Sequence, residues 1–254
     1  FKFINSANIY AADPPTIEDG TAHYQATLYA GNNSTQSVTQ TGNSTFQPDL
    51  VWIKDRTVAT TARIYDVIRA ANKSLIPATT SAENTETNFM NSFDAAGFSV
   101  GNGGSHLSAS GSNYVGWQWK AGGAGVANTD GTISSTVSAN TTAGFSVVTY
   151  TGTGANANVG HGLGVAPALV IIKSRSTVRD WPVFHTSIGA SYAVYLNATN
   201  AKDAVGAAMW NTTAPASTVF SVGTNASSNA SGTTYVAYCW AETAGFSKFS
   251  EYTG

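Results

Sequence analysis

The chain has 254 residues, of which 42% are hydrophobic and only 10% are charged. That length and apolar content suffice for one or two domains with buried cores. The 12 basic and 14 acidic residues are nearly balanced, so we expect no nucleic-acid partner. No run of about 18 apolar residues occurs, so we expect no membrane insertion. The single cysteine, Cys239, excludes an intrachain disulfide and a cysteine-based zinc cluster.

Residues 1–22 lie outside the repeated part of the sequence. They contain Pro14 and Pro15 followed by an acidic turn, a composition that favours a short, stiff connector. We expect this segment to be a linker or the tail of a preceding domain. The whole sequence is then interpreted as a fragment of a longer array.

From residue 23 onward, a series of motifs occurs twice, about 120 residues apart, which is the size of a domain. The pairs are TLYAG and VTYTG (27–31, 148–152), FQPDLVWIKDR and VAPALVIIKSR (46–56, 165–175), GFSVG and FSVG (97–101, 220–223), and YVGWQWKA and YVAYCWAE (114–121, 235–242). This order predicts a tandem duplication. We expect repeats at 23–122 and 144–254, a linker or edge strand at 123–143, and the start of a third repeat at 244–254. Two such domains in a row predict a rod.

Strand signals dominate both repeats. Short runs rich in Val, Ile, Thr, Tyr and Trp are bounded by Gly, Asn, Ser and Pro. Segment 60–72 has apolar residues at helical spacing, but its counterpart 180–190 contains Pro182 and is typical of a strand and a turn. We therefore expect a strand in both copies. The predicted fold is all-β, with two tandem antiparallel β-sandwich domains of jelly-roll type.

The motifs YVGWQWKA and YVAYCWAE each place large side chains on one strand face. The two sets are Val115, Trp117 and Trp119, and Val236, Tyr238 and Trp240. We expect this aromatic face to form the core of each sandwich, so that Trp119→Ala or Trp240→Ala unfolds its unit. Cys239, on the opposite face, is expected to be a small strand residue and not a reactive thiol.

Two groups of residues are candidates for ligand binding. Four cations recur at matched positions two residues apart on one strand face: Lys54 and Arg56, Lys173 and Arg175. They suit an acidic sugar, although strand ends also carry solvated cations. Two tryptophans outside the repeated motifs, Trp181 and Trp210, are candidate platforms for sugar rings, which stack on exposed indoles. The alternative for Trp210 is that it closes the end of the sandwich.

No catalytic residue, cofactor or metal site is predicted. His161 lies between two glycines, where we expect it to hold a turn by hydrogen bonds. Asp180, His185 and Ser187 supply the residue types of a catalytic triad, but no Gly-x-Ser-x-Gly element accompanies them. We therefore expect a protein that is not an enzyme. Two carboxylates or a Ser-His pair in one deep cleft would contradict this expectation.

Four long stretches carry a resemblance to a known family: residues 46–56, 121–154, 159–175 and 234–254. They resemble a repeated domain of unknown biochemical function in tail-fibre-like and other virion structural proteins of marine bacteriophages. The resemblance covers about residues 24–254 and implies a structural or host-attachment role in the extracellular phage particle. It supplies no catalytic residues.

Our first hypothesis is therefore a non-enzymatic virion protein, a tail-fibre or appendage module that attaches to a host-surface polysaccharide. It forms a homo-oligomer, with a trimer favoured, and contacts other virion proteins. Weak contacts are multiplied along the rod and across chains. The alternatives are a carbohydrate-binding module of a secreted multimodular protein and a ligand-free capsid decoration or filament subunit.

Overall fold

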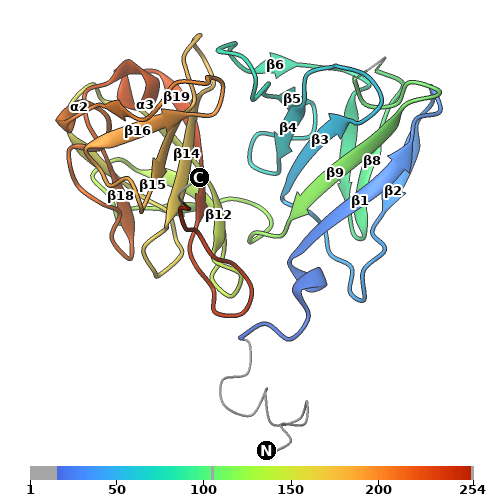
Figure 1. The fold of residues 1–254 in the computed structure, drawn as a ribbon, viewed down its shortest axis with the longest axis horizontal. Helices are drawn as coiled ribbons and strands as arrows, with labels where there is room; N and C mark the ends of the chain where they lie inside the picture. The colour runs from blue at the N-terminus through green and yellow to red at the C-terminus, as the bar shows by residue number, and fades with distance from the viewer. Residues whose placement is uncertain (1–15, 104–105, 253–254) are drawn as a thin grey trace, which may run out of the picture.

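The computed structural model describes residues 16–103 and 106–252, which form two β-rich units side by side (Figure 1). The first unit contains η1 (Gly20–Ala22), β1 (Tyr24–Ala30), β2 (Gln36–Thr39), β3 (Leu50–Asp55), β4 (Arg63–Asp66), β5 (Lys73–Ser74), β6 (Asn84–Thr85), β7 (Met90–Asp94), β8 (Gly97–Val100) and β9 (Asn113–Trp119). The second unit contains β10 (Val126–Asn128), β11 (Ser135–Asn140), β12 (Phe145–Thr151), β13 (Ala157–Gly160), β14 (Leu169–Ser174), β15 (Pro182–His185), β16 (Tyr192–Tyr195), β17 (Asp203–Ala204), α2 (Ala207–Trp210), β18 (Val219–Val222), α3 (Ala226–Asn229) and β19 (Thr234–Trp240).

The two units contain the same four-stranded arrangement. In the first unit the order is β1-β9-β3-β4, and in the second it is β12-β19-β14-β15, at the centre of an eight-stranded sheet. The register is also the same, because Tyr24 pairs with Trp119 as Phe145 pairs with Trp240. All pairings between these strands are antiparallel. The prediction of an all-β fold built from antiparallel sheets is confirmed.

A smaller sheet covers one face of each four-stranded arrangement, β2-β8-β7 in the first unit and β13-β18 in the second. The sandwich core of the first unit lies between them and includes Phe98 and Tyr114. Gly116 has no side chain, and a Cβ atom there would lie 2.6 Å from Cζ of Phe98. The phenyl ring therefore occupies the space that a side chain at position 116 would fill.

The predicted assignment of strand faces is wrong. The faces that line the sandwich cores carry Tyr114, Gly116 and Gln118 in β9 and Tyr235, Ala237 and Cys239 in β19. These faces are preferred because their small residues admit the rings of the second sheet, and because the buried Gln118 amide donates to Thr27 Oγ1 at 2.8 Å. The aromatic faces instead point out of each sandwich.

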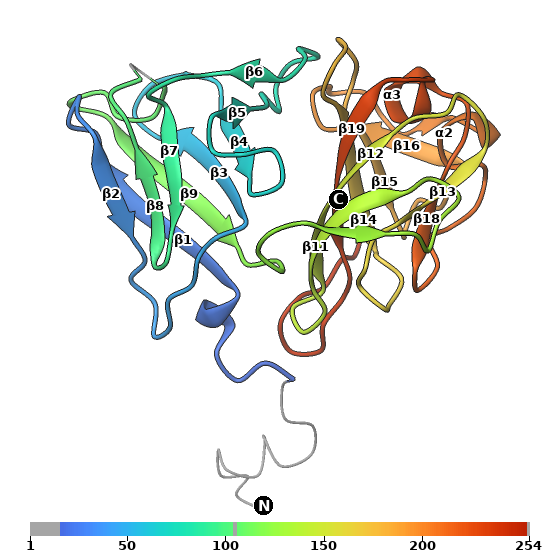
Figure 2. The ribbon, with the colours of Figure 1, turned by 180° about the vertical axis from the view of Figure 1, so that it is seen from behind.

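The aromatic faces of the two sheets pack against each other, so the units form one body and not a rod. One apolar cluster joins both units, with its buried members Leu50, Ile64, Leu75, Ala121, Phe145, Val147, Ile171, Trp181, Val183, Val236 and Tyr238. Trp52, Trp119 and Trp240 are partly buried at its margin. We call this contact the seam. The strands of both units that carry it lie on the inner sides of the two lobes (Figure 2).

Several segments named in the sequence analysis have the following structures. Segment 60–72 contains strand β4 followed by a turn, and segment 180–190 contains strand β15 followed by a turn, as predicted. Segment 123–143 forms β10 and β11 at the border of the large sheet. Residues 244–252 form a turn closed by a Thr243–Ser247 bridge and no strand. Most of the expected linker 1–22 lies outside the described residues.

Candidate binding site between the two units

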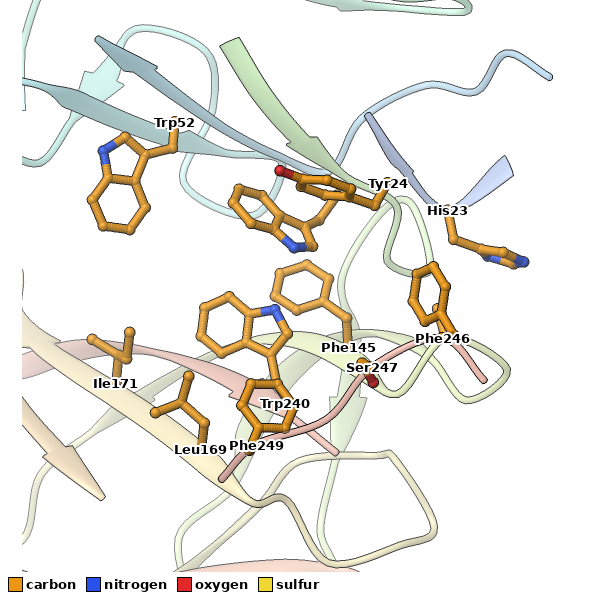
Figure 3. Close-up of a pocket in the computed structure, with 12 residues that line it drawn as sticks. His23, Tyr24, Trp52, Phe145, Leu169, Ile171, Trp240, Phe246, Ser247 and Phe249 are labelled. Carbon is orange, nitrogen blue, oxygen red and sulfur yellow. The ribbon is translucent and has the colours of Figure 1, made fainter. Parts of the chain in front are cut away.

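A cavity of about 390 Å³ opens at one end of the seam. Both sheets and the C-terminal turn line it, as Figure 3 shows. The lining residues are His23, Tyr24, Trp52 and Trp119 from the first unit, and Ala143, Phe145, Leu169, Ile171, Trp240, Phe246, Ser247 and Phe249 from the second. Concave sites with mostly aromatic walls and few polar groups are typical of small-molecule binding.

Equivalent residues of the two repeats face each other across this cavity. Trp119 ends β9 and Trp240 ends β19, and their rings meet edge to face with centroids 6.2 Å apart. Tyr24 in β1 occupies the register position of Phe145 in β12, and both line the cavity. Trp52 likewise matches Ile171. The duplicated sheets therefore meet through the same surface of each copy, as in a two-fold contact.

Three tryptophans contribute polar groups to the cavity. The indole N–H groups of Trp52, Trp119 and Trp240 have no hydrogen-bond acceptor among the described residues. None of these nitrogens is among the fully buried unsatisfied atoms of that part of the chain, so each remains accessible. The site thus combines aromatic surfaces with free donors, which suits a ligand with an apolar face and hydroxyl acceptors.

The C-terminal turn forms one rim of the cavity. The rings of Phe246 and His23 meet edge to face, with their centroids 6.1 Å apart. His23 Nδ1 lies 3.0 Å from the side-chain nitrogen Nδ2 of Asn140. Burial, with a smaller contribution from the charge of Lys120, lowers the pKa of His23 below its ordinary value. The imidazole is therefore neutral at pH 7 and adds no charge to the site.

A buried polar network crosses the seam beside the apolar cluster. Arg69 is paired with Asp66 at 2.5 Å and with Glu83 at 3.2 Å, all in the first unit. From the second unit, the hydroxyl of Tyr238 accepts from Arg69 at 3.1 Å and donates to Asp66 at 2.8 Å. Arg175 reaches back to Glu83 at 2.9 Å. The ion pair of the first unit is thus completed by side chains of the second.

Residues 79–83 of the first unit, here called the strap, lie against the second unit. The Trp181 indole donates to the carbonyl of Thr79 at 2.9 Å, and Lys173 Nζ donates to the carbonyl of Thr80 at 2.9 Å. Arg179 N also donates to the carbonyl of Thr80 at 2.9 Å, so three donors of the second unit bind the main chain of the strap. The strap fixes how the two units sit on each other.

The family model of DUF7483, a domain of unknown function, matches residues 19–254. The chain belongs to this family. A single match spans both repeats, so the DUF7483 domain comprises both sandwiches. Neither the curated proteins nor the solved structures provide a match.

The structure gives the recurring cations different environments. Arg56 is exposed, and Lys54 Nζ donates to the carbonyl of Asp55. Lys173 is fully buried beneath the strap, and burial lowers its pKa to about 8. Arg175 is engaged with Glu83 across the seam. The second pair therefore holds the units together and is not a free cationic surface.

The predicted tryptophan platforms are corrected. Trp181 is 0% exposed and Trp210 is 2% exposed, so neither ring face is available to a sugar. Trp210 packs inside the second sandwich, in line with the alternative that it closes the sandwich end. Trp52, Trp119 and Trp240 remain partly exposed at the seam. The repeated aromatic pattern in the sequence indicated these residues, but we interpreted it as the pattern of the sandwich cores.

Two structural interpretations are confirmed. The Nδ1 atom of His161 accepts from the amide of Leu163 at 3.2 Å, and its Nε2 lies 3.1 Å from the carbonyl of Ala216, so the ring holds the turn. Cys239 is fully buried, and burial raises the pKa of its thiol to about 12. It is an inert strand residue.

The residue types of a triad are not arranged as one. Asp180 accepts from the Asn197 side chain, while His185 Nδ1 accepts from the main-chain amide of Ser187. Within the described ranges, no group of three His, Cys, Asp or Glu side chains has the arrangement of a metal site. No helix of those ranges is long and apolar enough to cross a membrane.

Proposed function

We propose that this chain is a non-enzymatic structural module of a virion appendage, and that its seam cavity binds a neutral saccharide of the host surface. The virion role is supported by the resemblance of residues 46–56, 121–154, 159–175 and 234–254 to phage structural proteins. The saccharide role is supported by the walls of the cavity.

The observation that carries the ligand class is the combination of three accessible indoles, Trp52, Trp119 and Trp240. A pyranose ring presents an apolar face of C–H groups and a rim of hydroxyls. The apolar face stacks on an aromatic ring, and the hydroxyl oxygens accept from indole N–H groups. The lining contains no Lys, Arg, Asp or Glu, which favours a neutral sugar over an acidic one.

No chemical step is part of the proposal, because the cavity lining offers no carboxylate or thiol. Its one aliphatic hydroxyl, on Ser247, is engaged with the carbonyl of Ala241 at 3.2 Å. Binding alone accounts for the geometry. Repetition of weak sites over many copies in a particle then supplies adhesion.

A glycan array followed by calorimetry tests the site. Wild-type protein should bind a subset of neutral glycans, and Trp52→Ala should weaken that binding about tenfold or more, equivalent to about 1.4 kcal/mol. Tyr252→Ala, at an aromatic residue that is 93% exposed and outside the cavity, serves as the control. Absence of binding to any glycan at millimolar concentration, or unchanged binding by Trp52→Ala, would refute the saccharide role.

A separate experiment tests the virion role. Mass spectrometry of purified particles from a phage that encodes this sequence should detect the chain as a structural component. Its absence from particles, together with saccharide binding by the isolated protein, would instead indicate the carbohydrate-binding module of a secreted protein.

A further inference from the structure

The first unit's main sheet ends at β1, and no described strand pairs with the outer side of β1. The equivalent strand of the second unit, β12, is different. There, β11 pairs with β12 along Ser135–Asn140. The two repeats can therefore be compared directly. The edge that β11 covers in the second repeat is not covered by any described strand in the first.

The main-chain groups at the open edge can be identified from the ladder with β9. Lys120 N donates to the His23 carbonyl and Gly31 N donates to the Ser112 carbonyl, each at 2.9 Å. In an antiparallel ladder alternate residues bond to one neighbour, so the odd-numbered residues of β1 face β9 and the even-numbered ones face outward. The outward residues are Tyr24, Ala26, Leu28 and Ala30. Of their carbonyls, that of Ala30 accepts from the Gln36 side chain at 3.0 Å.

Nothing in β1 protects this edge against pairing. Natural edge strands are usually short, charged, bulged or interrupted by proline. Tyr24–Ala30 has seven residues, no charge and no proline, and its register with β9 is regular. Leu28 on this strand is 61% exposed. By contrast, the edge strand β7 carries a register irregularity between Met90 and Ser92.

The described chain ahead of β1 does not cover the edge. Gly20–Ala22 form a 3-10 turn capped by the Asp19 side chain, which accepts from the amide of Thr21. Residues 16–23 form no strand beside β1. Within residues 16–103 and 106–252, the outer side of β1 therefore has no strand partner.

We infer that β1 pairs antiparallel with β1 of a second copy of this chain, about a two-fold axis at Ala26. This register uses the free main-chain groups of Tyr24, Ala26 and Leu28 and leaves out Ala30, whose carbonyl is already occupied. It places Leu28 of each copy opposite Tyr24 of the other, an aromatic–aliphatic cross-strand pair. Because β1 carries no charged residue, the strand itself adds no charge repulsion to this contact. The two four-stranded sheets become one eight-stranded sheet, and the inference does not depend on saccharide binding.

Sedimentation equilibrium of the 254-residue chain tests this dimer. Wild-type protein should have the mass of two chains at high concentration and dissociate on dilution. Leu28→Lys should be a monomer at every concentration, because it places two charges at the new contact. Ala26→Pro should also be a monomer, since it removes only an outward N–H, which an edge strand tolerates. Val126→Lys is the matched control, at a 66% exposed valine on the edge strand β10, and should remain a dimer.

Circular dichroism of each variant establishes that it is folded, and the two β1 variants act through different atoms. If one of them fails to fold, the other still decides the question. A wild-type monomer at all concentrations, a wild-type trimer, or a dimer that persists in every folded β1 variant would overturn the inference.

Discussion

Tyr238 of the second unit and Asp66 of the first are joined by a hydrogen bond of 2.8 Å between two buried side chains. The same hydroxyl accepts from Arg69. A buried ion pair is stable only when its remaining hydrogen-bonding groups are satisfied. The first unit therefore depends on this hydroxyl oxygen, as well as on Arg175 of the second unit, to complete its own polar network.

Tyr238→Phe removes that atom and keeps the ring. We expect a loss of about 1–3 kcal/mol in the free energy of unfolding, because Asp66 and Arg69 each lose a buried partner. Urea denaturation measures the change. Tyr252→Phe, at an exposed tyrosine, should have no effect. Equal stability of Tyr238→Phe and wild type would show that the network does not hold the seam.

Glu83 makes stability depend on pH. Burial alone would raise the pKa of Glu83, but the hydrogen bond and charge of Arg175 and the charge of Arg69 outweigh burial and lower it below 4.5. The unfolded chain then binds more protons than the native one between these two pKa values. Stability contributed by Glu83 is complete above about pH 4.5 and declines as the pH falls through the lowered native pKa.

The Glu83→Gln variant should lack this part of the acid dependence and should be less stable than wild type at pH 7. Urea denaturation at pH 7 and at a series of lower pH values measures both effects. Parallel stability curves for wild type and Glu83→Gln would contradict this assignment.

The two faces of the main sheets should respond differently to truncation. Phe98→Ala opens a cavity in a sandwich core and should cost about 3–5 kcal/mol. Trp119→Ala removes a half-buried ring from the seam and should cost less, because part of that ring is already in water. Thermal unfolding of both variants provides the comparison. A greater loss for Trp119→Ala would restore the view that the aromatic face is the sandwich core.

Cys239 is a probe of opening in the second unit. Because burial raises its thiol pKa to about 12, the side chain is protonated at pH 8 and shielded by the core. A thiol reagent should label native protein at the rate of unfolding and denatured protein at once. Mass spectrometry follows the labelling, and the signal is unambiguous because the chain has one cysteine. Rapid labelling of native protein would show that β19 is accessible.

Strand positions were predictable because they depend on local sequence, namely on the alternation of apolar and polar residues and on the turn residues at the ends of each run. The faces were not, because β19 is apolar on both sides and its burial does not alternate. The small residues Gly116 and Ala237 were the usable signal, since a face with little volume of its own must receive rings from another sheet. Small residues on one face of a strand are therefore a better guide to the sandwich core than large aromatic residues on the other face.

The side-by-side arrangement of the units was not predictable for a different reason. Arg69, Glu83 and Arg175 are charged, and in sequence a charged residue indicates solvent. Each is satisfied only by partners that the fold brings together, some of them across the seam. The sequence analysis did not predict the seam, and so it did not predict the accessible tryptophans of the cavity. The cavity is formed only where the two repeats pack together.

The meeting of matched positions such as Trp119 and Trp240 bears on ancestry. Two separate chains of a single-repeat ancestor would have formed this contact as a symmetric pair. Gene duplication places both partners in one polypeptide, so association no longer depends on concentration. The partners are then free to diverge, and matched positions of the two copies do hold different residues, Tyr24 against Phe145 and Trp52 against Ile171.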